Sequence, residues 1–163
     1  MRHTLANGLE SAARWLSFGL IFLLPVVAVP SAIDPIEIHK QTVLVVLTLG
    51  AFLFWACSMV ARRTLLVRGG WIHAVPALVF GATAASAFAS SAPYLSWIGG
   101  SGQEYLSALT AFSLAVLYLV VVNVLGSDRD HRVVHGLLLL SAFVAGTVGL
   151  WSAFHGSVFT TVG

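Results

Sequence analysis

Five uncharged apolar runs dominate this sequence and leave it few ways to fold. The runs cover residues 15–31, 42–61, 71–90, 106–125 and 133–154, and none of them contains an Asp, Glu, Lys or Arg residue. A bilayer core about 30 Å thick needs roughly 20 apolar helical residues per crossing. Because each run comes close to that length, the pattern predicts an all-α, polytopic membrane protein. We expect five transmembrane helices that form a single domain over residues 1–163.

The composition excludes a soluble domain of this size. Charged residues make up 9% of the chain and hydrophobic residues 58%, whereas an average soluble domain carries about 25% charged residues. Membrane lipids and other membrane helices or subunits are therefore the expected partners, and the net charge of +2 is too small to indicate nucleic acid. The single cysteine, Cys57, lies inside an apolar run, where we expect a small buried side chain.

The basic residues predict how the chain is oriented. With the N-terminus inside, the only lysine in the chain, Lys40, falls in an outer segment. The inner segments then hold all seven arginines: Arg2, Arg14, Arg62, Arg63, Arg68, Arg129 and Arg132. Such a split is a strong positive-inside signal. Trp15, Trp55 and Trp71 fall near the predicted inner interface, where an indole ring is favoured.

The N-terminal leader admits more than one interpretation. Residues 1–14 are long for the charged region of a signal peptide and contain Glu10, so we interpret the first run as a retained signal anchor. Within the leader, Leu5, Leu9 and Ala13 share one helical face. Residues 2–14 are thus predicted to form either a short helix on the inner membrane surface or a frayed terminus.

Two of the runs carry small residues at every fourth position. Small side chains let helix backbones approach closely, which drives association in lipid because hydrophobicity does not. The third run is also the least hydrophobic, so we expect it to be the most enclosed by protein; the alternative is that alanine is simply common in this genome. The predicted helix-packing residues are Ala77, Gly81, Ala85 and Ala89 in the third run, and Ser141, Ala145, Gly149 and Ala153 in the fifth.

The first outer segment, residues 34–41, concentrates charge. Asp34, Glu37, His39 and Lys40 supply two carboxylates, an imidazole and an ammonium group. Asp34 precedes Pro35, which favours an extended or turn conformation before a new helix. One interpretation is that these carboxylates sit at a helix N-terminus, where negative charge is favoured. The other is that they contact a ligand, and both stay open.

The second outer segment, residues 90–105, combines glycines with aromatic and polar residues. Gly99, Gly100 and Gly102 permit left-handed backbone, and Gln103 and Glu104 follow them. Tyrosines and a tryptophan in the same segment add aromatic surface. Two interpretations stay open here as well: a loop anchored at the interface by its aromatic residues, or a ledge that binds a sugar or a lipid headgroup.

Most kinds of chemistry leave no trace in the sequence. No histidine pair has metal-ligand spacing, and there is no phosphate-binding glycine loop, haem-attachment motif or nucleophile elbow. We therefore expect no metal and no cofactor, and we assign no catalytic residue. The apolar runs also lack the ionisable residues at depth that proton- or ion-coupled carriers need.

Short motifs in the outer segments resemble a known family. Asp34-Pro35-Ile36-Glu37 is followed by Lys40-Gln41, which leads directly into the second run. Further along come Ser90-Ser91, Pro93, Tyr94 and Ser96, then Gly99 and Gly102 with Gln103-Glu104, and a fourth run that ends near Asn123. In this order the motifs resemble the N-terminal part of the O-antigen ligase and polymerase family, over nearly the whole chain.

The resemblance implies a multi-pass glycosyltransferase of the bacterial cytoplasmic (inner) membrane. Members of this family act in lipopolysaccharide and polysaccharide biosynthesis, at the outer face, and take glycan from a polyprenyl-pyrophosphate carrier. The resemblance implies substrate-binding positions at Asp34, Glu37, Lys40, Gln103 and Glu104. Many members have an arginine near Gln103, which this chain lacks.

The family's essential arginine and histidine lie mostly in a large outer loop downstream of the region matched here. The resemblance therefore implies no catalytic residue in this chain, and we expect the chain to be truncated or incomplete. Whether it belongs to an enzyme stays open. The alternative is a non-catalytic accessory or structural subunit of a larger membrane complex.

Overall fold

A computed structural model describes residues 2–27, 35–64, 67, 70–99 and 107–154. All regular structure in these residues is helical. The elements are α1 (Arg2–Val27), α2 (Pro35–Arg62), the 3₁₀ helix η1 (Trp71–His73), α3 (Ala74–Ala89), α4 (Pro93–Ile98), α5 (Ala108–Val124) and α6 (Asp128–Phe154). Every predicted apolar run is matched by one apolar helix, which confirms the all-α polytopic class.

Length separates these helices into two groups. Within the described residues, three segments are long and apolar enough to cross a membrane: Thr4–Val26, Lys40–Arg62 and Asp128–Trp151. The shorter apolar helices α3 and α5 match the third and fourth runs. The 17 residues of α5 rise by about 25 Å, so this helix comes close to the thickness of a bilayer core.

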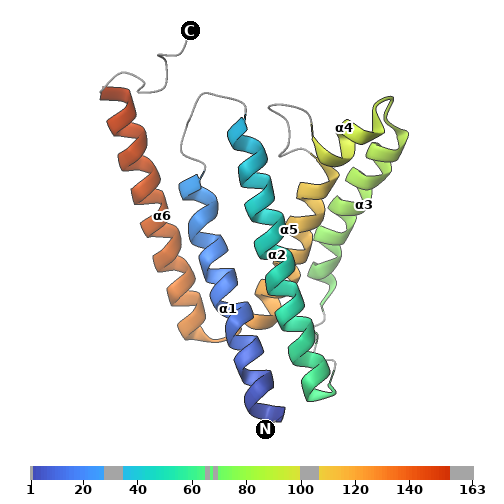
Figure 1. Ribbon diagram of the computed structural model, residues 1–163, viewed down its shortest axis with the longest axis vertical. Coiled ribbons are helices and arrows are strands. Elements are labelled where there is room, and N and C mark those ends of the chain that lie inside the picture. Colours follow the sequence, from blue (N-terminus) through green and yellow to red (C-terminus); the bar gives the residue numbers. More distant parts are fainter. Residues whose placement is uncertain (1, 28–34, 65–66, 68–69, 100–106, 155–163) are drawn as a thin grey trace.

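The helices lie side by side in the order α6, α1, α2, α5, α3 (Figure 1). The most extensive contact joins α1 to α2, and α5 packs on α2 while α6 packs chiefly on α1. The short helix α4 contacts α3 and α5 at the end of the bundle that the arginine split predicts to be the outer end. The start of α1 and the end of α6 lie at opposite ends of the bundle (Figure 1), in agreement with an odd number of crossings.

The first helix is longer than predicted. It runs without interruption from Arg2 to Val27, so residues 2–14 form neither a separate surface helix nor a frayed terminus. Ala6 and Ala13 are fully buried, and Ala13 belongs to the same buried cluster as Ala51 of α2. Close contact with α2 therefore continues into the leader and keeps it helical.

A short helix, α4, occupies part of the segment that was predicted to be a loop. Pro93 stands at the start of α4, where its missing N–H costs nothing. Just before it, the backbone N–H of Ala92 donates to Ser90 Oγ at 3.2 Å. The helix ends at Ile98, and Gly99 caps it with a φ of 102°, a positive φ that glycine adopts without steric cost.

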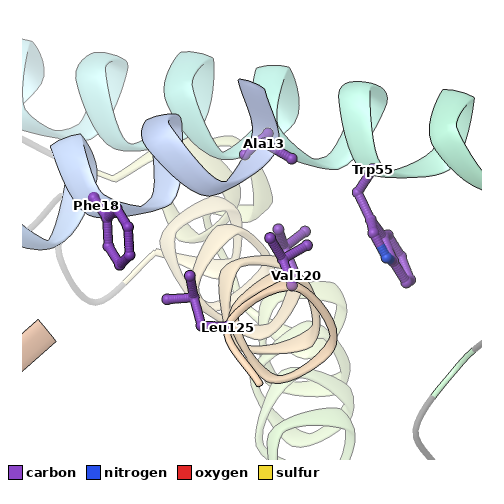
Figure 2. Close-up of a cluster of buried hydrophobic side chains, with 7 residues drawn as sticks. Ala13, Phe18, Trp55, Val120 and Leu125 are labelled. Atoms are coloured by element: carbon purple, nitrogen blue, oxygen red, sulfur yellow. The ribbon is translucent and has the colours of Figure 1, made fainter. Parts of the chain in front are cut away.

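Two buried clusters form the core. The inner cluster consists of Ala13, Phe18, Ala51, Trp55, Val120, Val124 and Leu125, from α1, α2 and the end of α5 (Figure 2). The outer cluster consists of Leu20, Leu44 and Leu117.

The tryptophans predicted at the inner interface differ in exposure. Trp55 is 6% exposed and so lies in the core, whereas Trp15 and Trp71 are exposed, as residues of an interfacial belt should be. Cys57 is also exposed, so the prediction of a buried cysteine is wrong.

The third span is at the edge of the bundle, which contradicts the expectation that it would be the most enclosed. Ala87 is the only buried residue of α3. Ala77, Gly81, Ala85 and Ala89 are all exposed, because α3 packs on α5 and α4 through its other face. A Cβ atom added at Gly81 would meet nothing within 4 Å. A packing role for this stripe stays a prediction that now requires a helix from outside the described residues.

The small residues of the fifth run have a different environment. Ser141 is fully buried on the helix that packs chiefly on α1. Ala145 and Gly149 are half-buried, and the side chain of Ala153 lies outside the described residues. At Ser141, therefore, the predicted packing role has a partner within the chain.

Candidate functional site

Described residues from both outer segments, and from the start of α5 that follows the second, meet at one side chain, Gln41 of α2. Its Nε2 atom donates a hydrogen bond of 2.7 Å to Ser107 Oγ and one of 2.9 Å to the backbone oxygen of Ile98. Thr110 Oγ1 lies 3.2 Å away as a third acceptor. We call this group of four residues the outer junction. It joins the outer ends of α2, α4 and α5.

Local structure explains why these groups need each other. Ile98 is the last residue of α4, and the last carbonyl groups of a helix have no partner within it. The Gln41 amide supplies one. Ser107 is the N-cap of α5 and accepts from the backbone N–H of Thr110 at 3.2 Å. An amide NH₂ group has two hydrogens, so the two shorter bonds use its full donor capacity.

The predicted substrate-binding residues are only partly within the described structure. Lys40 is half-buried on α2 and lines a small apolar hollow together with Leu20, Leu23, Leu24 and Val43. Glu37 falls in the first turn of α2, which begins at Pro35, although its side chain is not described. Asp34, Gln103 and Glu104 lie outside the described residues.

A charged network at the inner ends was not predicted from the sequence. Arg62, at the end of α2, pairs with the carboxylate of Glu10 on α1 and donates to Asn7 Oδ1 at 3.0 Å. Arg14 lies 3.7 Å from Glu10 Oε1 and 3.8 Å from Asp130 Oδ1 on α6. These side chains, which we call the inner network, connect three helices.

Asp130 is held in place by a capping box. The backbone N–H of Asp130 donates to Ser127 Oγ at 3.1 Å, and the backbone N–H of Ser127 donates to Asp130 Oδ2 at 3.3 Å. This reciprocal pair fixes the start of α6. The Ser127-x-x-Asp130 spacing could have revealed the cap, and Glu10 and Arg14 have the spacing of a helical ion pair. No local spacing connects either of them to Arg62.

Two cavities adjoin the inner network, and Glu10 and Arg62 line both of them. The first has a volume of about 270 Å³ and is lined by Glu10, Trp55, Ser58, Met59, Arg62, Thr64, Val67 and Asn123. The second, of about 290 Å³, is lined by Asn7, Glu10, Ser11, Arg14 and Arg62. Among the described residues no group of three or more His, Cys, Asp or Glu side chains could hold a metal ion.

Comparison of the whole chain with protein-family models, with curated proteins and with solved structures finds no match in any of the three. The support for a function therefore comes from the residues of the chain and their geometry.

Proposed function

We propose that this chain is the N-terminal membrane region of an O-antigen ligase-like glycosyltransferase, which handles polyprenyl-linked glycan at the outer face of a bacterial inner membrane. The outer junction is the observation that carries this proposal. Gln41 belongs to the Lys40-Gln41 motif on which the resemblance rests, and it bonds to Ile98 and Ser107. Both polar outer segments are thereby tied to one place on the outer side, where a glycan carrier would dock.

Lys40 gives this region its one candidate for ionic contact with a pyrophosphate. It is the only lysine or arginine in the outer segments, and it sits beside leucines of α1. A lysine can cover apolar surface with its stem while its ammonium group reaches the polar interface. One lysine binds phosphate as a point charge, so tight binding requires further basic groups from the rest of the protein. The competing role for Lys40 is an ion pair with Asp34 or Glu37.

The test uses the complete gene in a glycan-transfer assay, with membrane protein levels measured alongside. Lys40→Gln should reduce transfer strongly at normal abundance, whereas Lys40→Arg, which keeps the charge, should retain most of it. Normal transfer by Lys40→Gln would remove this lysine from the mechanism. If the complete gene supports no glycan transfer at all, the glycosyltransferase proposal fails.

A different observation favours a second candidate, a non-catalytic subunit of a larger membrane complex. The small-residue stripe of α3 faces away from the chain's own helices, and such stripes are typical of helix contacts in lipid. A photo-crosslinking residue at Gly81 should then capture another membrane helix in native membranes. The same group at Leu139, which is 74% exposed on α6, serves as the comparison position and should capture lipid.

A further inference from the structure

The first of the two cavities at the inner end, with a volume of about 270 Å³, has two walls of different character. Glu10 and Arg62 form a charged wall, and Trp55, Met59 and Val67 form an apolar one. Arg62 is the last residue of α2, on the side of the chain that holds all seven arginines. The cavity therefore lies where a helix passes from the hydrocarbon core to the headgroup region of the inner leaflet.

The charged wall keeps binding capacity after its own ion pair is made. Arg62 bonds to Glu10 and Asn7 through Nη2 alone, and its Nε and Nη1 atoms make no hydrogen bond within the described residues. The side chains of Arg62 and Glu10 are 31% and 27% exposed, so both remain reachable. The N–H group of Nε and the two N–H groups of Nη1 therefore remain as donors for a phosphate oxygen.

The charge balance of the inner network indicates what kind of molecule fits. Two arginines, Arg14 and Arg62, stand against two carboxylates, Glu10 and Asp130, so the network is neutral as a whole. A purely anionic molecule at Arg62 would also face the carboxylate of Glu10. A purely cationic molecule at Glu10 would face two guanidinium groups. A molecule that carries both charges a short distance apart satisfies both sides.

We propose that this cavity binds the headgroup of a zwitterionic phospholipid of the phosphoethanolamine type from the inner leaflet. The phosphate accepts hydrogen bonds from Arg62, the primary ammonium group donates to Glu10, and the upper acyl chain follows the wall of Met59 and Val67. This site is at the opposite end of the bundle from the outer junction, and its existence does not depend on any role in glycan transfer.

The experiment is native mass spectrometry of the purified chain, released from nanodiscs that hold equal amounts of three phospholipids. These are phosphatidylethanolamine, phosphatidylcholine and phosphatidylglycerol. Phosphatidylcholine has no N–H to donate to Glu10, and phosphatidylglycerol has no cation. We expect one molecule of phosphatidylethanolamine to be retained, roughly tenfold over either competitor, the factor that a single charge-assisted hydrogen bond supplies. Equal retention of all three, or a preference for phosphatidylglycerol, would overturn the proposal.

Four variants locate the site. Arg62→Gln should abolish retention, and Glu10→Gln should remove the preference for phosphatidylethanolamine over phosphatidylcholine. Thr64→Trp fills the cavity from an exposed position without altering any charge, so it tests the site even if the charge variants fail to fold. Arg129→Gln removes one inner charge at an exposed position that lines neither cavity, and it should retain lipid normally. Normal retention by Thr64→Trp would show that the lipid binds elsewhere.

Discussion

The two ends of the bundle are held together by different chemistry. At the inner end, four charged side chains link α1, α2 and α6. At the outer end, one uncharged amide, that of Gln41, links α2 to α4 and α5. The difference follows from topology: the positive-inside rule places arginines at the inner end, and each arginine drawn between helices needs a carboxylate beside it. The outer segments contain one lysine and no arginine.

The two ends should also differ in how much they stabilise the protein, and the end with more charge should contribute less. The side chains of Glu10 and Arg62 are 27% and 31% exposed, and water screens such pairs so that they stabilise little. Two partners of Gln41 are more deeply buried: Ser107 is 2% exposed and Thr110 is 7% exposed. Because removing one partner of a buried hydrogen bond leaves the other unsatisfied, the neutral junction should matter more to stability than the charged network.

The largest expected effect, an all-or-none one, concerns which end is inside. In a Cys57→Ser background, Ser91→Cys at the outer end and Gly126→Cys at the inner end are both at exposed positions. In intact cells, an impermeant thiol reagent should label Ser91→Cys and leave Gly126→Cys unlabelled until the membrane is permeabilised. Labelling of Gly126→Cys in intact cells would reverse the assignment of the two ends.

The next largest effect is expected at the outer junction. Gln41→Glu keeps the shape of the side chain but removes both N–H donors, which leaves Ser107 Oγ and the carbonyl of Ile98 without this partner. The free energy of unfolding, measured by SDS titration in mixed micelles, should fall by about 1–3 kcal/mol. A second variant, Gln41→Leu, also lacks both donors but adds no charge. Its loss of unfolding free energy should be the same at low and high salt. A stability equal to wild type in both variants would contradict the outer junction.

A smaller effect is expected from the inner ion pair. A double-mutant cycle of Glu10→Gln and Arg62→Gln should give a coupling of about 0.2–1 kcal/mol, the range for partly exposed pairs. Because added salt screens exposed charges, the coupling should shrink as the ionic strength rises. A coupling larger than the loss at Gln41, or one that salt leaves unchanged, would reverse the ranking of the two ends.

The smallest effect is expected away from both ends, on the outward face of α3. Gly81→Leu should change the unfolding free energy of the isolated chain by less than about 0.5 kcal/mol, as is usual for surface substitutions, because nothing lies within 4 Å of an added Cβ. The matched change Ser141→Leu, at a fully buried small residue on α6, should cost about 1–3 kcal/mol through overpacking. Equal effects at the two positions would mean that α3 is packed within the chain after all.

What sequence reasoning could predict is set by the range of each signal. Apolar length along the chain predicts every long helix, because a bilayer imposes that length locally. Periodicity shows which residues share a face, as for Ala77 and Gly81, but not which helix that face meets. The pairing of Glu10 with Arg62 joins residues 52 positions apart, and no local pattern reports such a distance.

The same limit applies to the outer side. Lys40 and Gln41 are adjacent in the sequence, and charge drew attention to Lys40 as the binding residue. Gln41 has the clearer role in the described structure, because its amide reaches Ile98 and Ser107. A neutral amide at the start of an apolar run gives no sign of partners more than 50 residues away. The roles of Asp34, Gln103 and Glu104 stay predictions, since these residues lie outside the described part of the chain.

The packing of α6 on α1 has a consequence for how the protein is made. These are the first and last helices of the described chain, and membrane helices associate after they have been inserted. During synthesis, α1 enters the bilayer with its α6-facing side in contact with lipid and stays so while every intervening helix follows. Arg14 acquires its second carboxylate, Asp130, only when α6 arrives. Closure of this side of the bundle therefore waits for α6, and a ribosome that stalls before residue 128 leaves this side open to lipid.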